Sequence, residues 1–590
     1  MHRPTPAFQI APWLAASAAA LALLASASAA DKPSPSLQLN QVGYLPGGAK
    51  WAALSSPAPA QADGFSVVDA RTGKTVFTGT LGAAAEWPLS KEAVRLADFG
   101  ALRAPGSYQL RVAGLPDSAP FSISDTAYEA VTRAAVRAYY LNRASIELKP
   151  EHAGEFARPA GHPDTVVRIH ASAAGPKRKE GDLISSPKGW YDAGDYNKYI
   201  VNSGITVYTL LAAYEHHPAY FQKLALNIPE TGNGLPDLLN EVLWNLDWML
   251  TMQDPDDGGV YHKLTDLRFD GMQLPHHSKT ERYVVMKTTA AALDFAAVMA
   301  QASRVFKAFE AQRPGLSARA LKAAQNAWAW AKAHPDVRYR QPADVRTGAY
   351  GDEDLRDEFV WAAAELFVST GDASYLPAPQ QLPPKLLVPS WNEVAALGWM
   401  TLAHHRSLLP DAPGPFSLAK LVPTRITALA QELADDWQTS PYRTTLRRSD
   451  FVWGSNAVVM NQAMMLLQGY ELTGERRMLD AAQAALDYVL GRNATNISQV
   501  TGLGSNPAKN PHHRPSGGYG KAVPGFLVGG PNPNLQDKAQ CPPYPSTEVA
   551  KAYLDHLCSF ASNEIAINWN APLVYVSAAL EALTPPSEKK

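Results

Sequence analysis

The stretch Gly189-Trp-Tyr-Asp-Ala-Gly-Asp-Tyr-Asn-Lys-Tyr199 places two carboxylates, Asp192 and Asp195, three residues apart with only Ala and Gly between them. Small spacers let the backbone turn sharply, and Asp itself favours turns. Both carboxylates can therefore face one cavity, with aromatic residues beside them. A water molecule held between carboxylates next to flat aromatic faces suits glycoside hydrolysis. An isolated pair of this kind is more often an Asx turn, so the rest of the chain has to decide.

The overall composition is that of a globular chain. It has 590 residues, of which 46% are hydrophobic and 18% charged, and this length predicts two or more domains. The formal net charge of −2 includes no basic excess, so nucleic acid is not an expected partner. Nothing in the sequence indicates an oligomer, and we expect a monomer.

The N-terminus has the pattern of a signal peptide. His2 and Arg3 precede an Ala- and Leu-rich run from Trp13 to Leu24, and Ala27-Ser28-Ala29 fits a small-x-small cleavage site. The run is short for a membrane span, and no cysteine follows it that could carry a lipid anchor. We therefore predict a signal peptide over residues 1–30, no membrane segment, and an exported protein that is either periplasmic or secreted.

Residues 36–124 and 125–585 differ in pattern, which predicts two domains. The first segment has short strands separated by turn residues, as in Phe65–Asp69 and Ser107–Val112, and this is typical of a small β-sandwich. The second is mainly helical, with apolar residues at i, i+3, i+4 spacing and long loops in which a site is expected. The expected helices are Val131–Leu141, Leu238–Leu250, Thr288–Phe306, Phe359–Ser369, Asn392–Leu408, Val458–Leu472 and Leu479–Leu490. Gly371 and Gly474 each follow the last turn of such a helix, a C-cap signal that indicates a repeated helical hairpin.

Two of the loops carry further candidate residues. His512 and Arg514 could bond sugar hydroxyls or orient a carboxylate, or could belong to a solvated basic turn. Glu564 is followed by the apolar run Ile565–Ile567. An apolar setting raises the pKa of a carboxyl, as a general acid near neutral pH requires. The alternative is a Glu that bonds backbone amides at the start of a helix.

Taken together, these stretches resemble glycoside hydrolase family 9, the cellulase family with an (α/α)6 barrel. The resemblance runs from about Leu37 to Leu583. The Asp-Ala-Gly-Asp tetrad at 192–195, the His-x-Arg signature from Ser498 to Arg514 and the Asp…Phe…Glu…Asn-Ala signature from Tyr553 to Ala571 all match. The resemblance implies a mainly α fold, in which an (α/α)6 barrel catalytic domain is preceded by a small immunoglobulin-like β-sandwich.

The catalytic residues of the family carry over position by position. The resemblance implies that Asp195 is the general base that activates water, that Asp192 helps to hold this water, and that Glu564 is the general acid that protonates the leaving oxygen. His512 would act next to the cleaved bond, and Asp555 would be a supporting carboxylate of the catalytic network. The family inverts the anomeric carbon, which requires about 6.5–9.5 Å between the acid and base carboxyls.

The same resemblance suggests residues that bind the glucan. They are Arg514, His262, Trp391, Trp453 and Trp569, with Tyr196 of the opening stretch as a further flat face. Core packing is the alternative for Trp391.

The resemblance bears on two metal sites of the family, and we expect calcium at the first and no zinc at the second. An acidic loop aligns with a structural calcium site, and the alternative is a solvated acidic loop. The calcium ligands would be Asp357 and Glu358, with Asp354, and with Asn392 or Glu393 as a further donor. Relatives often hold a structural zinc with Cys and His, but Ala144 and Gly161 stand at the matching thiolate positions, the latter before His162. We therefore predict that zinc is absent.

The two cysteines, Cys541 and Cys558, flank the loop that leads to Glu564. Export permits a disulfide, but the sequence does not show the geometry, so bonded and free forms both stay open.

We expect an exported, inverting endo-β-1,4-glucanase, that is, a cellulase, which acts on a β-glucan polysaccharide or oligosaccharide without a cofactor for catalysis. An exo-acting cellobiohydrolase or β-glucosidase is the first alternative, because the sequence does not show whether the cleft is open at both ends. A non-catalytic glucan-binding protein is the alternative of another class, and the intact Asp192, Asp195 and Glu564 argue against it.

Overall fold

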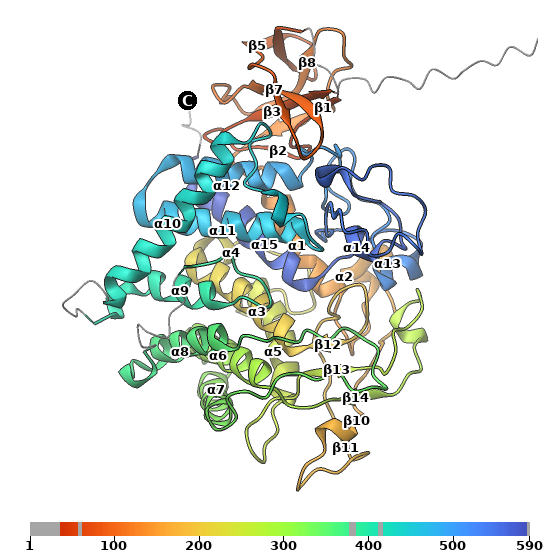
Figure 1. Cartoon of the computed structure of the whole chain (residues 1–590), viewed down its shortest axis with the longest axis vertical. Coiled ribbons are helices and arrows are strands. Elements are labelled where there is room, and N and C mark those ends of the chain that lie inside the picture. Colours follow the sequence, from red (N-terminus) through yellow and green to blue (C-terminus); the bar gives the residue numbers. More distant parts are fainter. Residues whose placement is uncertain (1–35, 57–61, 377–384, 411–416, 587–590) are drawn as a thin grey trace, which may run out of the picture. The chain divides into compact units, whose positions relative to one another are not determined.

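The structure, a computed structural model, describes residues 36–56, 62–376, 385–410 and 417–586 (Figure 1). The predicted signal peptide lies outside these residues. Strands occupy the first part of the described chain and long helices the remainder. None of the described helices combines the length and the apolar character that crossing a bilayer requires.

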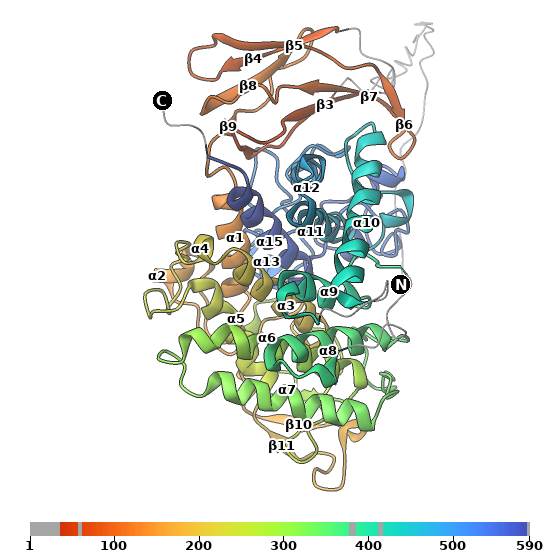
Figure 2. The same cartoon turned by 90° about the vertical axis from the view of Figure 1, so that its left-hand side faces the viewer.

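The first nine strands form two sheets that face each other (Figure 2). One sheet has the strand order β1-β3-β7-β6, and the other has the order β2-β9-β8-β4-β5. Leu54, Phe65, Val67 and Leu110 are buried between them, as the core of a sandwich requires. The strands are β1 (Ser36–Gln38), β2 (Gly43–Tyr44), β3 (Trp51–Ser56), β4 (Gly64–Asp69), β5 (Thr75–Thr80), β6 (Ala85–Trp87), β7 (Glu92–Asp98), β8 (Gly106–Val112) and β9 (Phe121–Ile123).

The helical part begins at Glu129. Its helices are α1 (Glu129–Leu141), α2 (Pro150–Ala153), α3 (Ile200–His216), α4 (Pro218–Phe221), α5 (Asp237–Thr251), α6 (Thr289–Phe306), α7 (Leu316–Ala333), α8 (Arg356–Thr370), α9 (Ala395–His404), α10 (Leu418–Thr439), α11 (Ser455–Thr473), α12 (Arg476–Val489), α13 (Arg514–Tyr519), α14 (Phe560–Asn563) and α15 (Ile567–Leu583).

These helices form an inner and an outer layer. Helices α3, α6, α11 and α15 are buried along almost all of their length, and α3 packs against both α6 and α15. Helices α7 and α10 bury one face only, and they pack against α6 and α11. Two nested layers of helices make up the helical barrel that positions the site.

The predicted helices are present, and the two glycine C-caps are confirmed. Gly371 and Gly474 end α8 and α11 in the left-handed conformation, with φ of 73° and 72°. The expected helices did not include α3, α7, α10 or α15. Helix α3 is buried on all sides and rich in β-branched residues that suggest a strand, whereas α7 and α10 bury one face only and have a periodicity that could have been used.

A small sheet lies where the sequence predicted only loops. Its strand order is β11-β10-β14-β13-β12. The strands are β10 (Val167–Ile169), β11 (Leu183–Ile184), β12 (Lys198–Tyr199), β13 (Lys263–Thr265) and β14 (Arg282–Val284). Strands of two or three residues are too short to give an alternating pattern. Because β12 runs directly into α3, this sheet fixes the end of the Asp192–Asp195 turn.

Candidate active site

The turn that carries Asp192 and Asp195 closes on itself. The amide of Asp192 donates a hydrogen bond to the carbonyl oxygen of Asn197 (3.1 Å). A Cβ atom at Gly194 would lie 2.9 Å from Glu564 Oε1 and 2.6 Å from the carbonyl oxygen of His512. Only glycine fits such a contact without a shift. The three separate motifs therefore meet at Gly194.

Asp195 is held through one of its two oxygens. Oδ2 accepts hydrogen bonds from the hydroxyl of Tyr199 (3.0 Å) and from the side-chain amide of Asn197. The described part of the chain supplies no donor to Oδ1, so this oxygen can accept a proton from water. Asp195 is fixed in orientation and still has a reactive oxygen.

Asp192 is buried, and both of its oxygens are occupied. Oδ1 accepts from the side-chain amide of Asn202 (2.6 Å), and Oδ2 accepts from the hydroxyl of Tyr350 (2.8 Å). Burial and the nearby charge of Asp195 raise the pKa of Asp192 well above its ordinary value. Asp192 is therefore fixed in the turn by Asn202 and Tyr350.

Glu564 faces the same turn from the other side. Its Oε1 accepts from the amide of Gly194 (3.2 Å), and its Oε2 accepts from the indole N–H of Trp453 (3.1 Å). Burial, followed by the charge of Asp195, raises the pKa of Glu564 to about 8. A carboxyl with this pKa holds its proton at neutral pH, as a general acid must.

His512 is neutral and presents one ring nitrogen. Its Nδ1 lies 2.7 Å from the carbonyl oxygen of Leu557. A carbonyl can only accept, so Nδ1 carries the proton and Nε2 keeps its lone pair. Burial lowers the pKa of His512 to about 4, which preserves this state at neutral pH.

Arg514 belongs to the frame of the site. It is buried, and it donates to the carbonyl oxygens of Gly194 (2.6 Å) and Asp270 (2.8 Å). Its guanidinium carbon lies 5.2 Å from the centre of the Phe269 ring. Arg514 thus links the catalytic turn to the loop between β13 and β14.

Asp555 supports two parts of the site without touching the catalytic carboxyls. It accepts from the backbone amides of Lys509 (2.9 Å) and Asn510 (2.8 Å), just before His512. It also accepts from the side-chain amide of Asn563 (3.2 Å), the residue before Glu564. This geometry makes Asp555 a positioning residue.

Two of the predicted aromatic residues lie at the site. Trp453 is 43% exposed, bonds Glu564 and packs against the ring of Phe560 at 5.2 Å between centroids. Trp569 is half-buried. Its ring lies against the backbone of Gly454, the residue after Trp453, where an added Cβ would be 2.9 Å from the ring. Trp391 is one layer further out, where it packs edge-on against Tyr350 at 5.1 Å.

Two predicted binding residues are instead buried. Tyr196 is 1% exposed, and its hydroxyl donates to the carbonyl oxygen of Gln273. His262 is also 1% exposed, and its ring nitrogens contact Thr288 (3.0 Å) and the carbonyl oxygen of Ala349 (2.8 Å). Neither has a face or a nitrogen left for a sugar. The prediction that they bind glucan directly is wrong, because the residue type alone does not show burial.

Several residues of the site were not predicted. Asn202 and Tyr199 follow the turn closely, and a buried Asn in the apolar start of a helix is a signal that could have been used. Tyr350 lies far away in the sequence, and no local pattern distinguishes it.

The chain has the disulfide that the sequence left open. Cys541 and Cys558 are bonded, with their Cα atoms 5.7 Å apart. The bond closes the loop that precedes Glu564, so it restrains the approach to the candidate acid.

Four acidic side chains gather around the start of α8, where calcium was predicted, and one of them, Asp294, comes from α6. Oxygen atoms of Asp294, Asp352, Asp357 and Glu358 are buried without a hydrogen-bond partner. Burial and mutual repulsion raise the pKa of Glu358 and of Asp294 well above their ordinary values. Calcium prefers oxygen ligands, so these residues stay candidates for the predicted site. Asp354, predicted as a ligand, pairs with Arg356, and its side chain is 54% exposed, so it lies outside this group of buried oxygens.

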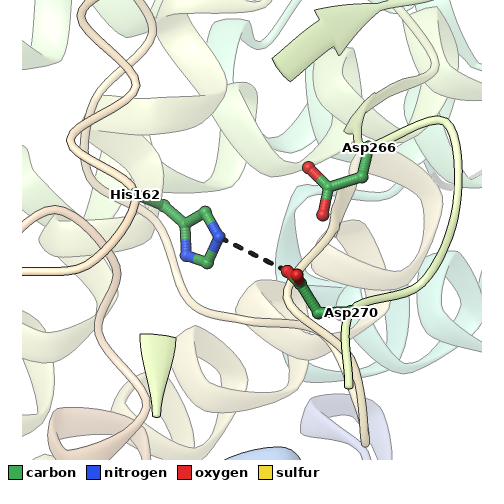
Figure 3. A group of neighbouring side chains, drawn as sticks. All are labelled: His162, Asp266 and Asp270. Atoms are coloured by element: carbon green, nitrogen blue, oxygen red, sulfur yellow. Dashed lines mark ion pairs between the residues drawn. The ribbon is translucent and has the colours of Figure 1, made fainter. Parts of the chain in front are cut away.

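The residues at the family's zinc position do not fit a zinc held by cysteines. Ala144 is buried against Tyr191 and Tyr196. A Cβ at Gly161 would lie 2.6 Å from Cβ of Pro275, so a cysteine would not fit there without a shift. His162, Asp266 and Asp270 lie close together nearby (Figure 3). Each offers one possible ligand atom for a metal, and these atoms are all within 4.8 Å of one another.

The helical barrel and the facing carboxyls at Gly194 define a glycoside hydrolase. The model of glycosyl hydrolase family 9 matches residues 128–577, and that of the cellulase N-terminal ig-like domain matches residues 32–117. The chain belongs to glycosyl hydrolase family 9. The predicted family and the predicted fold, an (α/α)6 barrel after an immunoglobulin-like domain, are confirmed.

Relatives cover almost the whole chain. A xyloglucan-specific endo-beta-1,4-glucanase, BoGH9A of Bacteroides ovatus, is 43% identical over 96% of this chain and 97% of its own length. Endoglucanase D of Acetivibrio thermocellus is 33% identical over 94% of this chain and 84% of its own. The solved structure titled Bacteroides ovatus GH9 has a TM-score of 0.86 and 41% identity, and covers 93% of this chain and 99% of that one.

Proposed function

We propose that the chain is an endo-acting β-1,4-glucan hydrolase that inverts the anomeric carbon, with Glu564 as the acid and Asp195 as the base. The enzyme class follows from the family and from relatives named as endoglucanases. The observation that carries the assignment of roles is the contact of Glu564 Oε1 with the amide of Gly194, next to Asp195. This contact sets a protonated carboxyl against the turn that holds an oriented carboxylate.

The acid half of the reaction follows from the pKa of Glu564. At neutral pH its proton is retained, and burial beside Asp195 is the cause. As the bond to the leaving oxygen breaks, Glu564 transfers this proton to the oxygen. The indole of Trp453 keeps the carboxyl in one orientation and offers an exposed face on which a sugar ring can stack.

The base half of the reaction uses water. Asp195 Oδ1 takes a proton from the water as it attacks the anomeric carbon on the face opposite the leaving oxygen. Tyr199 and Asn197 hold Oδ2, so that the attacking water meets a carboxylate of fixed orientation. Asp192 keeps the turn in place through Asn202 and Tyr350, and Nε2 of His512 can accept a hydrogen bond from a substrate hydroxyl.

The mode of cleavage is tested by an early time course on cellohexaose with products separated by size. An endo-acting enzyme gives a spread of mid-length products from the start. A single small product, glucose or cellobiose, would instead identify an exo-acting enzyme. Xyloglucan should be compared with unbranched β-glucan in the same assay, since a relative with 43% identity is named as xyloglucan-specific. No hydrolysis of either substrate would contradict the proposed function.

We also propose that calcium stabilises the start of α8. The support is the set of buried carboxylate oxygens without partners. Calcium should raise Tm by a few degrees, because an ion that binds only the folded state stabilises it. Asp357→Asn should abolish this shift and the matched control Asp354→Asn should keep it, since Asp354 points to solvent. An equal shift in all three proteins would contradict the site.

Export is a further part of the proposal. It is supported by the apolar run after Arg3 and by the disulfide, which forms in oxidising compartments. N-terminal sequencing of the protein recovered outside the cytoplasm should begin near Asp31, and recovery with Met1 intact would contradict it.

A further inference from the structure

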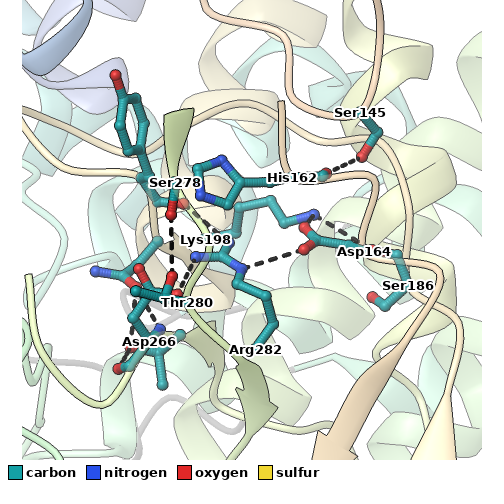
Figure 4. A network of polar contacts seen from close by, with 12 residues as sticks. Ser145, His162, Asp164, Ser186, Lys198, Asp266, Ser278, Thr280 and Arg282 are labelled. Atoms are coloured by element: carbon teal, nitrogen blue, oxygen red, sulfur yellow. Dashed lines mark hydrogen bonds and ion pairs between the residues drawn. The ribbon is translucent and has the colours of Figure 1, made fainter. Parts of the chain in front are cut away.

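A buried cluster of charges lies beneath the catalytic turn, and Arg282 is at its centre (Figure 4). Arg282 begins β14, Lys198 begins β12, and Asp266 directly follows β13, which pairs with both strands. The small sheet therefore brings these three residues together. The Arg282 guanidinium pairs with Asp164 (3.1 Å) and with Asp266 (2.9 Å).

The first link from this cluster to the base runs through the backbone. The Arg282 guanidinium also donates to the carbonyl oxygen of Tyr196 (2.9 Å). Tyr196 directly follows Asp195, so Arg282 fixes the chain next to the candidate base. On the far side of Asn197, the buried ammonium of Lys198 pairs with Asp164 at 2.7 Å. The backbone is thus held on both sides of Asn197.

The second link runs through the Asn197 side chain. Its Oδ1 accepts from the amide of Asp266 (2.8 Å) and from the hydroxyl of Thr265 (3.0 Å). Its amide nitrogen can then only point to Oδ2 of Asp195, to which it donates. The carboxylate of Asp266 is fixed by Arg282, so the orientation of Asp195 depends on the same guanidinium.

A third link reaches Arg514. His162 Nε2 lies 3.8 Å from Oδ2 of Asp270, which also accepts from the hydroxyl of Ser278 (2.9 Å). The carbonyl oxygen of Asp270 accepts from Arg514, which in turn bonds Gly194. The loop that carries Asp266 and Asp270 is therefore attached to the catalytic turn at two places.

We infer that Arg282 is a positioning residue for the general base, because it fixes the Tyr196 carbonyl and, through Asp266, the Asn197 amide that holds Asp195. The inference rests on the proposed function. It concerns a residue that is 5% exposed and that contacts Asp164, Asp266 and the Tyr196 carbonyl oxygen. A lysine at this position keeps the charge but lacks the planar fork that serves Asp164, Asp266 and Tyr196 together.

Arg282→Lys is the test. We expect kcat on cellohexaose to fall about 100-fold, as a small misplacement of a catalytic group does, while KM changes less than about twofold. The loss should be the same on an aryl cellobioside with a good leaving group, because the base is needed for both substrates and Glu564 is not altered. A loss on cellohexaose alone would place the effect on the acid and overturn the inference.

Arg304→Lys is the matched control. Arg304 of α6 is also a hub of ion pairs, with its side chain 13% exposed; it pairs with Glu215 and Glu365 and makes no contact with the catalytic turn in the described residues. Both variants should lower Tm, but only Arg282→Lys should lower kcat of the folded protein. Equal kcat in both variants would leave Arg282 with a structural role only and overturn the inference.

A second variant covers the case in which Arg282→Lys fails to fold. Asp266→Asn keeps the backbone amide that bonds Asn197 and removes the charge that Arg282 pairs with. We expect a smaller loss of kcat with unchanged KM. Wild-type kcat in Asp266→Asn would overturn the inference. If Asp195→Ala, measured in the same assay, is inactive, the proposed function still stands. Inactive wild-type protein would instead contradict the proposed function.

Discussion

Glu564→Gln should lower kcat on cellohexaose by a factor of about 10²–10⁴, the range that general acid catalysis contributes. Gln has nearly the same shape, but its single carbonyl oxygen can accept from only one of Gly194 and Trp453, and it has no proton to give to the leaving oxygen. The comparison of substrates with poor and good leaving groups then separates the missing proton from the missing contact.

The assignment of Glu564 as the acid also predicts how activity changes with pH. The pKa of Glu564 is raised to about 8, so the active, protonated form is present below this pH and is lost as pH rises through it. The alkaline limb of kcat/KM for the wild-type enzyme should therefore lie near pH 8 and be absent in Glu564→Gln. An unchanged alkaline limb in the variant would contradict the assignment.

Glu564→Gln should lower activity without lowering the thermal stability of the protein. When the pKa of a carboxyl is raised in the folded state, the fold loses stability as pH rises from the unfolded to the folded pKa, here from about 4.5 to 8, and the loss persists at higher pH. Glu564→Gln should therefore melt at or above the wild-type Tm at pH 7. Glu471→Gln is a control, because partial burial raises the pKa of Glu471 to about 7, while its side chain stays 28% exposed near His217 (3.9 Å). This control should keep wild-type kcat.

Asp195→Ala should be the other variant with a large loss, again about 10²–10⁴ in kcat. Without the carboxylate no group removes the proton from the attacking water, since both oxygens of Asp192 already accept from Asn202 and Tyr350. Binding of cellotetraose should persist, because Asp195 is not among the stacking residues.

Azide distinguishes a lost base from a lost fold in this variant. Azide attacks carbon without giving up a proton, so it should restore part of the rate of Asp195→Ala and leave Glu564→Gln slow on cellohexaose. Activity of Asp195→Ala equal to wild type, with no azide present, would remove Asp195 from the role of base.

Helices α8 and α11 could be predicted with their ends, because each stops at a glycine whose left-handed conformation the sequence signalled. Helix α7 was not predicted, although it lies in the outer layer and buries one face only. Helix α3 has apolar and β-branched residues on all sides because it is buried on all sides. The small sheet gave no pattern because each of its strands has two or three residues.

Single residues of the candidate site also differ in whether the sequence could reveal them. Asp192, Asp195 and Glu564 could be predicted because glycine and alanine spacers and an apolar setting accompany them. Tyr350 and Arg282 come from distant loops, and only the fold shows that they reach the turn. Tyr196 and His262 have the residue types of a binding surface, but packing against Gln273 and Tyr339 covers them.

The central claim is that Glu564 supplies the proton while Asp195 activates water. The most direct test is the rate of Glu564→Gln relative to wild type on cellohexaose and on a dinitrophenyl cellobioside, whose leaving group needs no proton. The account predicts a loss at least about 100-fold larger on cellohexaose. Equal losses on the two substrates would show that Glu564 is not the acid and would contradict the account.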